Sequence, residues 1–222
     1  MRCENFVLID HCPLGTTCAR VGCMPSKAAL HAAKLWQSRQ EMARIGVSGW
    51  DSLSLDSAQT WQYVRQQRDH FTESATKKTR AATGNHLIQG SARFVEPTLL
   101  EVDTQEGVVR IRASAVVIAT GSKAYVPDWL APVRDRSLTT DELFELADLP
   151  KRLAVLGLGA VGLEIGLVLA RLGVEVTGAG NSLAGIDDPV IYERAAQAFG
   201  RDMTLWSGQP AQAIPCPQGW AI

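Results

Sequence analysis

The sequence has little of several features that mark large protein classes. Five cysteines in 222 residues are too few for a disulfide-stabilised secreted scaffold, and their odd number leaves at least one outside any internal bridge. With 22 Lys and Arg against 23 Asp and Glu, the net charge of −1 gives no electrostatic attraction to nucleic acid or to an anionic membrane. The longest nearly apolar stretch, residues 153–170, contains Glu164 and several glycines, unlike a membrane span. The N-terminus lacks the apolar core and cleavage site of a signal peptide, so we expect a soluble, cytoplasmic protein.

The hydrophobic pattern predicts an α/β protein. An apolar run over residues 6–9 ends on Asp10 and predicts a short buried strand. Apolar residues then recur at helical spacing over two long stretches, after which short runs predict strands. The predicted helices cover 25–44, 56–82, 140–146 and 188–199, and the predicted strands cover 87–88, 92–94, 99–102, 108–111 and 115–119. The tail from residue 207 has no assignable pattern.

A pair of cysteines stands at the start of the first long helix. A bridge between Cys18 and Cys23 would close a very small loop, worth only about 2 kcal/mol to stability, so the pattern favours redox chemistry over a structural role. Cys23 lies where the N–H groups of a helix start favour a thiolate, and Lys27 adds positive charge nearby. Cys18 would then be the sulfur that exchanges with an external disulfide. Zinc is the chemical alternative, but the scattered histidines supply no further ligands, so we expect no metal.

A glycine-rich turn lies between a predicted strand, 153–156, and a helix that reaches about residue 172. In a dinucleotide-binding βαβ unit Gly157 makes the tight turn, Gly159 lets the backbone approach the pyrophosphate, and Gly162 lets helix and strand pack closely. The alternative is a helix that merely packs closely. The next strand end, residues 177–181, has neither a carboxylate for a ribose 2′-hydroxyl nor an arginine for a 2′-phosphate, so the residues do not choose between NAD and NADP. An apolar strand followed by a nucleotide-type signal in both halves suggests two mononucleotide-binding folds in series.

The segment from Gly15 to Lys27 resembles the active-site motif of the class I pyridine nucleotide-disulfide oxidoreductases, FAD enzymes that include the lipoamide dehydrogenases. Their usual motif is G-G-T-C-x-N-x-G-C-x-P-S-K. Thr16 stands where the family has its second glycine, and Arg20 stands in place of the asparagine, as in a divergent subgroup. The resemblance implies that Cys18 and Cys23 are the catalytic pair.

The resemblance also implies residues that bind the cofactors. Asp10 matches the acid that holds the adenosine ribose of FAD, and Ala92 lies in a small-residue stretch under the adenine, although simple packing explains Ala92 as well. Glu164 matches a residue near the nicotinamide, and NAD is favoured over NADP by analogy with lipoamide dehydrogenases. The remaining cofactor-binding positions are Thr17, Gly22, Lys27, Thr120, Gly121, Ser122, Gly157, Gly159 and Gly162.

The family fold implies two Rossmann-like doubly wound domains, both incomplete in this sequence. We expect a partial FAD-binding domain with the redox disulfide over residues 1–149 and a partial NAD(P)-binding domain over 150–222. The first glycine-rich turn and the interface domain with its His-Glu pair are missing, since no such turn precedes residue 6 and no histidine follows His86.

The resemblance implies a dihydrolipoyl dehydrogenase, which oxidises dihydrolipoamide with NAD⁺ through FAD. A mercuric or other small-disulfide reductase of the same family, and a catalytically inactive truncated fragment, are the alternatives. The implied partners are a small dithiol or disulfide, a second subunit in a homodimer and a 2-oxo acid dehydrogenase complex, with no role for nucleic acid or membrane.

Overall fold

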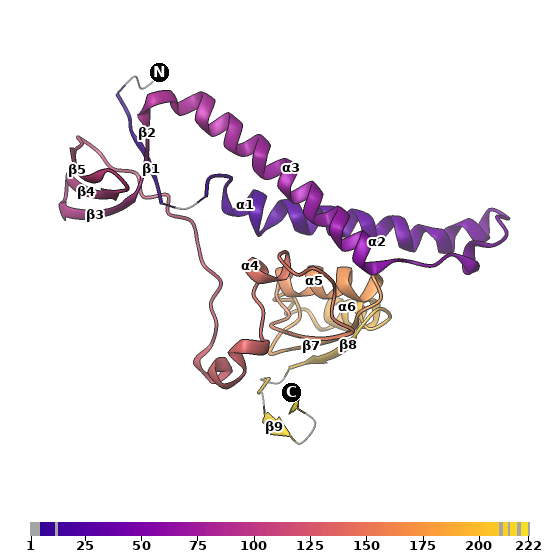
Figure 1. The fold of residues 1–222 in the computed structure, drawn as a ribbon. Helices are drawn as coiled ribbons and strands as arrows, with labels where there is room; N and C mark the ends of the chain where they lie inside the picture. The colour runs from indigo at the N-terminus through magenta and orange to yellow at the C-terminus, as the bar shows by residue number, and fades with distance from the viewer. Residues whose placement is uncertain (1–4, 12, 209–210, 213, 217–218, 222) are drawn as a thin grey trace. The chain divides into compact units, whose positions relative to one another are not determined.

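The computed structural model describes residues 5–11, 13–208, 211–212, 214–216 and 219–221. The chain forms two compact units, one from residues 1–20 and 68–123 and the other from residues 21–67 and 124–222. Each unit therefore contains two separate pieces of the sequence. Figure 1 shows the elements in chain order.

The first unit contains two small sheets. Strands β1 (Leu8–Asp10) and β2 (Leu87–Gln89) pair in parallel, with Asp10 opposite Gln89. A short helix, α1 (Thr17–Arg20), follows β1, and a 3-10 turn, Gly84–His86, leads into β2. The second sheet is an antiparallel meander of β3 (Ser91–Glu96), β4 (Leu99–Thr104) and β5 (Gly107–Arg112).

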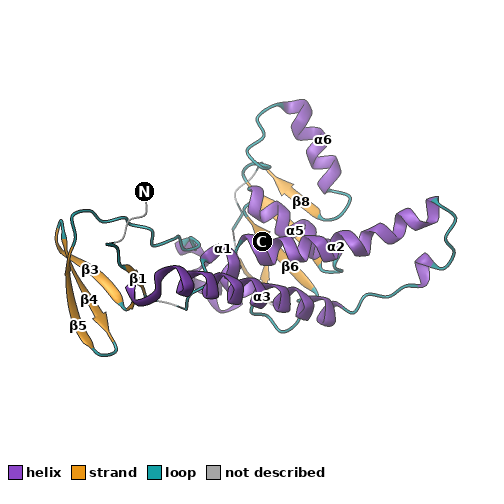
Figure 2. Ribbon diagram, turned by 90° about the horizontal axis from the view of Figure 1, so that it is seen from above, coloured by secondary structure: helices purple, strands orange, loops and turns teal. Residues whose placement is uncertain are grey.

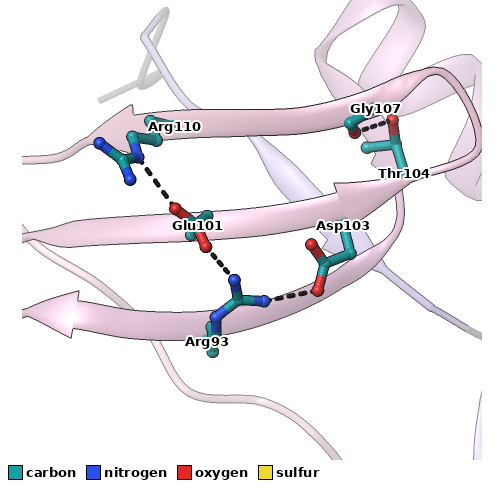
Figure 3. A network of polar contacts seen from close by, with 6 residues as sticks. All are labelled: Arg93, Glu101, Asp103, Thr104, Gly107 and Arg110. Atoms are coloured by element: carbon teal, nitrogen blue, oxygen red, sulfur yellow. Dashed lines mark hydrogen bonds and ion pairs between the residues drawn. The ribbon is translucent and has the colours of Figure 1, made fainter.

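The meander has one charged face and one apolar face because side chains alternate along each strand. On the charged face Glu101 of β4 lies between Arg93 and Arg110, with which it forms ion pairs, and Arg93 also pairs with Asp103 (Figure 3). On the other face Leu100 and Val102 are buried. The observed register, with Arg93 opposite Glu101 and Glu101 opposite Arg110, places the opposite charges side by side.

The second unit contains a three-stranded parallel sheet in the order β6-β7-β8. The elements follow one another as β6 (Arg152–Leu156), α5 (Ala160–Arg171), β7 (Glu175–Gly180), α6 (Pro189–Phe199) and β8 (Thr204–Ser207). This is the βαβ arrangement that the glycine-rich turn predicts, extended by a second helix and a third strand (Figure 2). Strands β9 (Ile214–Cys216) and β10 (Gly219–Ala221) pair as an antiparallel hairpin.

Helix α2 (Cys23–Arg44) packs on α5, and both belong to the second unit. Ala29 and Ala33 of α2 are fully buried, and these small side chains one helical turn apart allow close approach to the core. After a 3-10 turn, Trp50–Ser52, helix α3 (Ser57–Thr83) begins in this unit and places Trp61 in the same core. The Trp61 ring stacks on Phe144, with ring centroids 5.7 Å apart.

Phe144 directly follows the short helix α4 (Thr140–Leu143). Thr139 and Glu142 form a reciprocal capping box at its start, which lowers the pKa of Glu142, first through the hydrogen bond from the Thr139 backbone and then through Arg134. A 3-10 segment, Asp128–Arg136, precedes α4. A short helix in the 127–150 connector was predicted, and the structure ends it three residues earlier than expected.

The α/β class predicted from the sequence is confirmed, but the strand predicted over residues 115–119 is wrong. These residues lie in no strand or helix, and Val117 and Ile118 are 89% and 71% exposed. An apolar run becomes a strand only when a neighbouring backbone completes its hydrogen bonds. Within the described residues of this unit, β1 and β2 pair with each other and neither takes 115–119 as a partner. In the part of the chain that the structure describes, no helix is both apolar and long enough to cross a bilayer.

Candidate functional site

The two motif cysteines occupy the starts of two consecutive helices. Cys18 lies in α1, in the first unit, and Cys23 is the first residue of α2, in the second unit. Both side chains are exposed and both are thiols rather than half-cystines. Helix α2 begins two residues before the expected Pro25, so Cys23 stands in its first turn, among backbone N–H groups that have no partner within the helix. The Gly22 N-cap supplies no side-chain hydrogen bond there.

The loop before Cys18 has an unusual backbone. Gly15 has φ +132°, and a Cβ on it would lie 2.6 Å from Cγ2 of Thr72. Thr16 has φ +64°, the left-handed region that β-branched residues seldom adopt, and it stands where the family motif has glycine. Its hydroxyl accepts a hydrogen bond from the Ala19 N–H at 3.1 Å and so caps α1. Arg20, the other departure from the motif, donates to the Pro13 carbonyl at 3.4 Å.

Lys27 and Glu164, both predicted site residues, form an ion pair between α2 and α5. The Lys27 side chain is 59% exposed and that of Glu164 is 28% exposed. The hydrogen bond from Lys27 lowers the pKa of Glu164 despite partial burial, and a hydrogen bond from Ser26 acts in the same direction. Glu164 is therefore held as a carboxylate, and it neutralises the lysine that sequence analysis counted as positive charge near Cys23. Ser26 was not predicted as a site residue, although it belongs to the Pro-Ser-Lys part of the motif.

Two residues predicted to hold the adenosine of FAD lie close together in the first unit. Asp10 ends β1, and its backbone carbonyl accepts a hydrogen bond at 3.0 Å from Gly90, which immediately precedes β3. Ala92 lies in β3, opposite Val102 of β4. A Cβ at Gly90 would lie 2.5 Å from the Asp103 carbonyl oxygen, so this position is restricted to glycine by packing. The Asp10 carboxylate and the small Gly90 are compatible with a ribose there.

The predicted second flavin signature is brought next to the cysteine loop. Gly121 has φ +75°, and a Cβ built on it would lie 3.2 Å from Oγ1 of Thr17. Thr17 and Gly121 are thus neighbours within the first unit. Thr120 and Ser122 are exposed on either side of Gly121, in a segment without regular secondary structure.

The glycine-rich turn after β6 has the conformation that a dinucleotide site needs. Gly157 has φ +102°, and its N–H donates to the Ala179 carbonyl of β7 at 2.8 Å. A Cβ at Gly162 would overlap the Gly157 carbonyl oxygen, so helix and turn pack in direct contact. A Cβ at Gly159 would meet nothing within 4 Å, which leaves open space beside the N-terminus of α5. Helix N-terminal N–H groups favour anions, so this open space is compatible with the pyrophosphate site predicted from the sequence.

Leu158, between the first two of these glycines, was not predicted from the sequence as a site residue. Its side chain is 2% exposed and belongs to the core. An apolar residue within a G-x-G turn is a signal that could have found it. Within the described residues, no group of three or more His, Cys, Asp or Glu side chains is placed to hold a metal ion.

Comparison with known proteins identifies one family. The model of the pyridine nucleotide-disulphide oxidoreductases matches residues 4–202. Dihydrolipoyl dehydrogenase 3 of Pseudomonas aeruginosa is 36% identical over 170 residues, which are 74% of this chain and 35% of that protein. Mercuric reductase of Bacillus cereus is 31% identical over 176 residues, 78% of this chain and 27% of that protein. The chain thus spans about a third of the length of these relatives.

Solved structures show the same fold. The crystal structure of LpdA from Mycobacterium tuberculosis superposes with a TM-score of 0.79 at 21% identity, over 97% of this chain and 48% of that one. The predicted similarity to the fold of FAD-dependent disulfide reductases is therefore confirmed.

Proposed function

The chain belongs to the pyridine nucleotide-disulphide oxidoreductase family, and from that premise we propose that it is the redox half of a dihydrolipoyl dehydrogenase. FAD and NAD(P) are the cofactors of this family. In this proposal the FAD-binding domain covers residues 1–149 and the NAD(P)-binding domain covers 150–222. The observation that carries the proposal is the pair of exposed thiols, Cys18 and Cys23, with the second in the first turn of a 22-residue helix.

The chemistry assigned to the cysteines is thiol–disulfide exchange. With the pair oxidised, a substrate thiolate attacks the Cys18 sulfur, the bond between Cys18 and Cys23 breaks, and Cys23 leaves as a thiolate. The second substrate thiolate then attacks the substrate sulfur of the mixed disulfide, which releases the substrate as a disulfide and Cys18 as a thiolate. The substrate loses two electrons and the cysteine pair gains them. FAD, which Asp10, Thr17 and Gly121 would hold, would supply the acceptor for these two electrons and the hydride donor for NAD(P)⁺.

Other residues have positioning or binding roles in this proposal. The Asp10 carboxylate would accept hydrogen bonds from the FAD ribose, and Thr17 with Gly121 would line the flavin side of the first unit. Gly22, Ala92, Thr120 and Ser122 complete the proposed flavin contacts. Lys27 is assigned to flavin binding and its ion-pair partner Glu164 to nicotinamide binding, and Gly157, Gly159 and Gly162 would hold the second pyrophosphate.

Dihydrolipoamide is favoured as substrate because relatives named dihydrolipoyl dehydrogenase reach 36% identity. A mercuric reductase at 31% identity makes mercuric ion or another small disulfide the second candidate. The proposal extends to a homodimer, to association with a 2-oxo acid dehydrogenase complex and, given the sparse cysteines, to a cytoplasmic location. An inactive fragment is the outcome if the chain does not bind flavin.

The test is the visible absorption spectrum of the purified chain with FAD, before and after excess dithiol. We expect a bound flavin spectrum that gains a long-wavelength shoulder on reduction of the pair, from the Cys23 thiolate beside oxidised flavin. Cys18→Ser retains Cys23 and should keep the shoulder, whereas Cys23→Ser should abolish it. Cys216→Ser, outside the motif, is the matched control and should behave as the unaltered chain. A shoulder that survives Cys23→Ser, or a chain that binds no flavin, would overturn the proposal.

A further inference from the structure

Among the residues that the structure describes, the carboxyl edge of the parallel sheet in the second unit carries no charged side chain. Gly157 follows β6, Asn181 follows β7 and Gly208 follows β8. Hydrogen bonds join these ends, from Gly157 N–H to the Ala179 carbonyl at 2.8 Å and from Gly208 N–H to the Gly180 carbonyl at 2.9 Å. The sequence from 176 to 186 contains no Asp, Glu, Lys or Arg, and neither does the sequence from 203 onward. In a doubly wound sheet this edge is where a dinucleotide binds.

Position 180 is where a β7 side chain would face the glycine-rich turn. A Cβ on Gly180 would lie 2.9 Å from the Leu158 backbone nitrogen and 3.5 Å from Gly157 Cα. A side chain there would therefore project toward the turn that is proposed to hold the pyrophosphate. Dinucleotide sites that prefer NAD place an acid for the ribose in this region.

Leu158 occupies the space on the same face of β7. A Cβ on Gly178, two residues before Gly180, would lie 2.6 Å from Leu158 Cδ2. The buried Leu158 in the turn therefore requires glycine at positions 178 and 180 of the strand, because a side chain at either position would collide with the turn. Packing in this chain consequently favours a strand end without a ribose-binding acid.

The nearest acids farther along the chain do not replace it. Asp188 lies beyond the strand end and accepts hydrogen bonds from the Val190 and Ile191 N–H groups, both at 2.9 Å, as the N-cap of α6. Asp187 is exposed beside it, outside the sheet edge. The side chains that directly follow β7 are the neutral Asn181 and Ser182, which can hydrogen-bond to a hydroxyl or to a phosphate.

We propose that the nucleotide site of this chain accepts NADP(H) as well as NAD(H), with affinities within tenfold of each other. The inference rests on the proposed function, since it assigns the substrate class of the same site. A carboxylate at the strand end would accept a hydrogen bond from the 2′-hydroxyl of NAD and repel the 2′-phosphate of NADP. An arginine would form an ion pair with the 2′-phosphate and so favour NADP. The neutral edge formed by Gly180, Asn181 and Ser182 does neither.

The test is calorimetric titration of the full chain with NAD⁺ and with NADP⁺ at one salt concentration. We expect dissociation constants that differ by less than tenfold. Asn181→Asp changes an amide to a carboxylate of the same shape, and it should weaken NADP⁺ at least tenfold while changing NAD⁺ less than threefold. Gln62→Glu makes the same type of change on an exposed position of α3 and is the matched control. It should leave both affinities unchanged.

Three other results of these titrations would overturn the inference, and they differ from one another in the affinities measured. A preference of more than tenfold for either nucleotide in the unaltered chain contradicts the proposed lack of discrimination. If the unaltered chain binds NAD⁺ and NADP⁺ equally and the Asn181→Asp variant still does, the end of β7 does not face the 2′ position of the adenosine ribose. Binding of neither nucleotide would instead overturn the nucleotide site of the proposed function, and this inference with it.

Discussion

Thr16 introduces backbone strain into the loop before Cys18. Its φ of +64° lies in the left-handed region, which costs a β-branched residue about 1–3 kcal/mol. Its hydroxyl offsets part of that cost by accepting the Ala19 N–H at the start of α1. The family motif has glycine here, which adopts this conformation without strain. The departure from the motif thus exchanges backbone freedom for a helix cap.

We predict that Thr16→Gly raises the free energy of unfolding by about 1 kcal/mol, because glycine removes the strain and replaces an N-cap at a loss of only a few tenths. Thr16→Ala should lower it by about 1 kcal/mol, since alanine loses the cap and keeps the strain. Urea unfolding followed by circular dichroism measures both. A Thr16→Gly variant that is less stable than the unaltered chain would show that the strain is negligible.

The Lys27–Glu164 ion pair makes a pH-dependent contribution to the free energy of unfolding, and the direction of the Glu164 pKa shift gives its sign. The pKa of Glu164 is lowered below its ordinary value of 4.5, so the pair stabilises the fold above that pH and ceases to do so as the pH falls through the lower, folded-state value. Because Lys27 is 59% exposed, solvent screening keeps the contribution below about 1 kcal/mol.

Glu164→Gln should therefore slightly reduce the free energy of unfolding at pH 7, and the difference from the unaltered chain should shrink as the pH falls below 4.5 and vanish below the lowered folded-state pKa. Unfolding curves collected from pH 7 downward test this expectation. Glu175→Gln, at an exposed position of β7, is the matched control for replacing a carboxylate by an amide. A deficit of constant size at every pH would indicate lost packing rather than a lost charge.

At the scale of the element, two glycines of one turn have separable roles. Gly162 lies inside α5, where a Cβ would overlap the Gly157 carbonyl oxygen, whereas a Cβ at Gly159 meets nothing within 4 Å. Gly162 permits close packing of helix and turn, and Gly159 leaves a space open beside the helix N-terminus. The same six-residue motif thus serves packing at Gly162 and leaves room for the proposed ligand at Gly159.

We predict that Gly162→Ala lowers the unfolding free energy by about 1–3 kcal/mol through overpacking. Gly159→Ala should leave stability within about 0.5 kcal/mol, since its φ of −69° suits alanine, but should weaken NAD⁺ binding because the methyl group enters the space assigned to pyrophosphate. Thermal unfolding and nucleotide titration of both variants separate the effects. If Gly159→Ala binds NAD⁺ with unchanged affinity, the pyrophosphate does not bind beside this turn.

At the scale of the whole molecule, the buried apolar residues are unevenly divided. The main core cluster lies in the second unit and joins α2, the start of α3, α4 and the βαβ elements. In the first unit, by contrast, Val117 and Ile118 are exposed in a segment without regular structure. Local stability follows buried contacts, so the units should differ in how readily they open.

Hydrogen exchange should reveal that difference. We expect the slowest amide exchange in α5 and β7, which combine internal hydrogen bonds with buried side chains such as Leu169 and Val176. Residues 115–119 should exchange fastest among the apolar segments. Protection of 115–119 equal to that of β7 would show that this run forms a strand in solution, as its sequence predicts.

Much of the fold followed from local sequence pattern. The two long helices lie within two residues of their predicted ends, and the glycine-rich turn lies between the predicted strand and helix. Strand 115–119 was predicted wrongly and β8 was not predicted, because a strand depends on a partner that the local pattern does not specify. The spacing of the cysteines and glycines is what predicts them as site residues, whereas the packing role of Leu158 became evident only from its burial against β7.

By itself, the sequence determined the chemical types and their order: two cysteines at a helix start, an acid at a strand end, and glycines spaced for a tight turn. Only the tertiary structure decided which of these groups meet. Lys27 and Glu164 are 137 residues apart and pair because α2 packs on α5. Asp10 meets Gly90 because β1 pairs with β2, and Leu158 covers Gly178 because β6 pairs with β7. Periodicity is a local property of the chain, whereas charge pairing and close packing depend on contacts between distant segments, which form only when the chain folds.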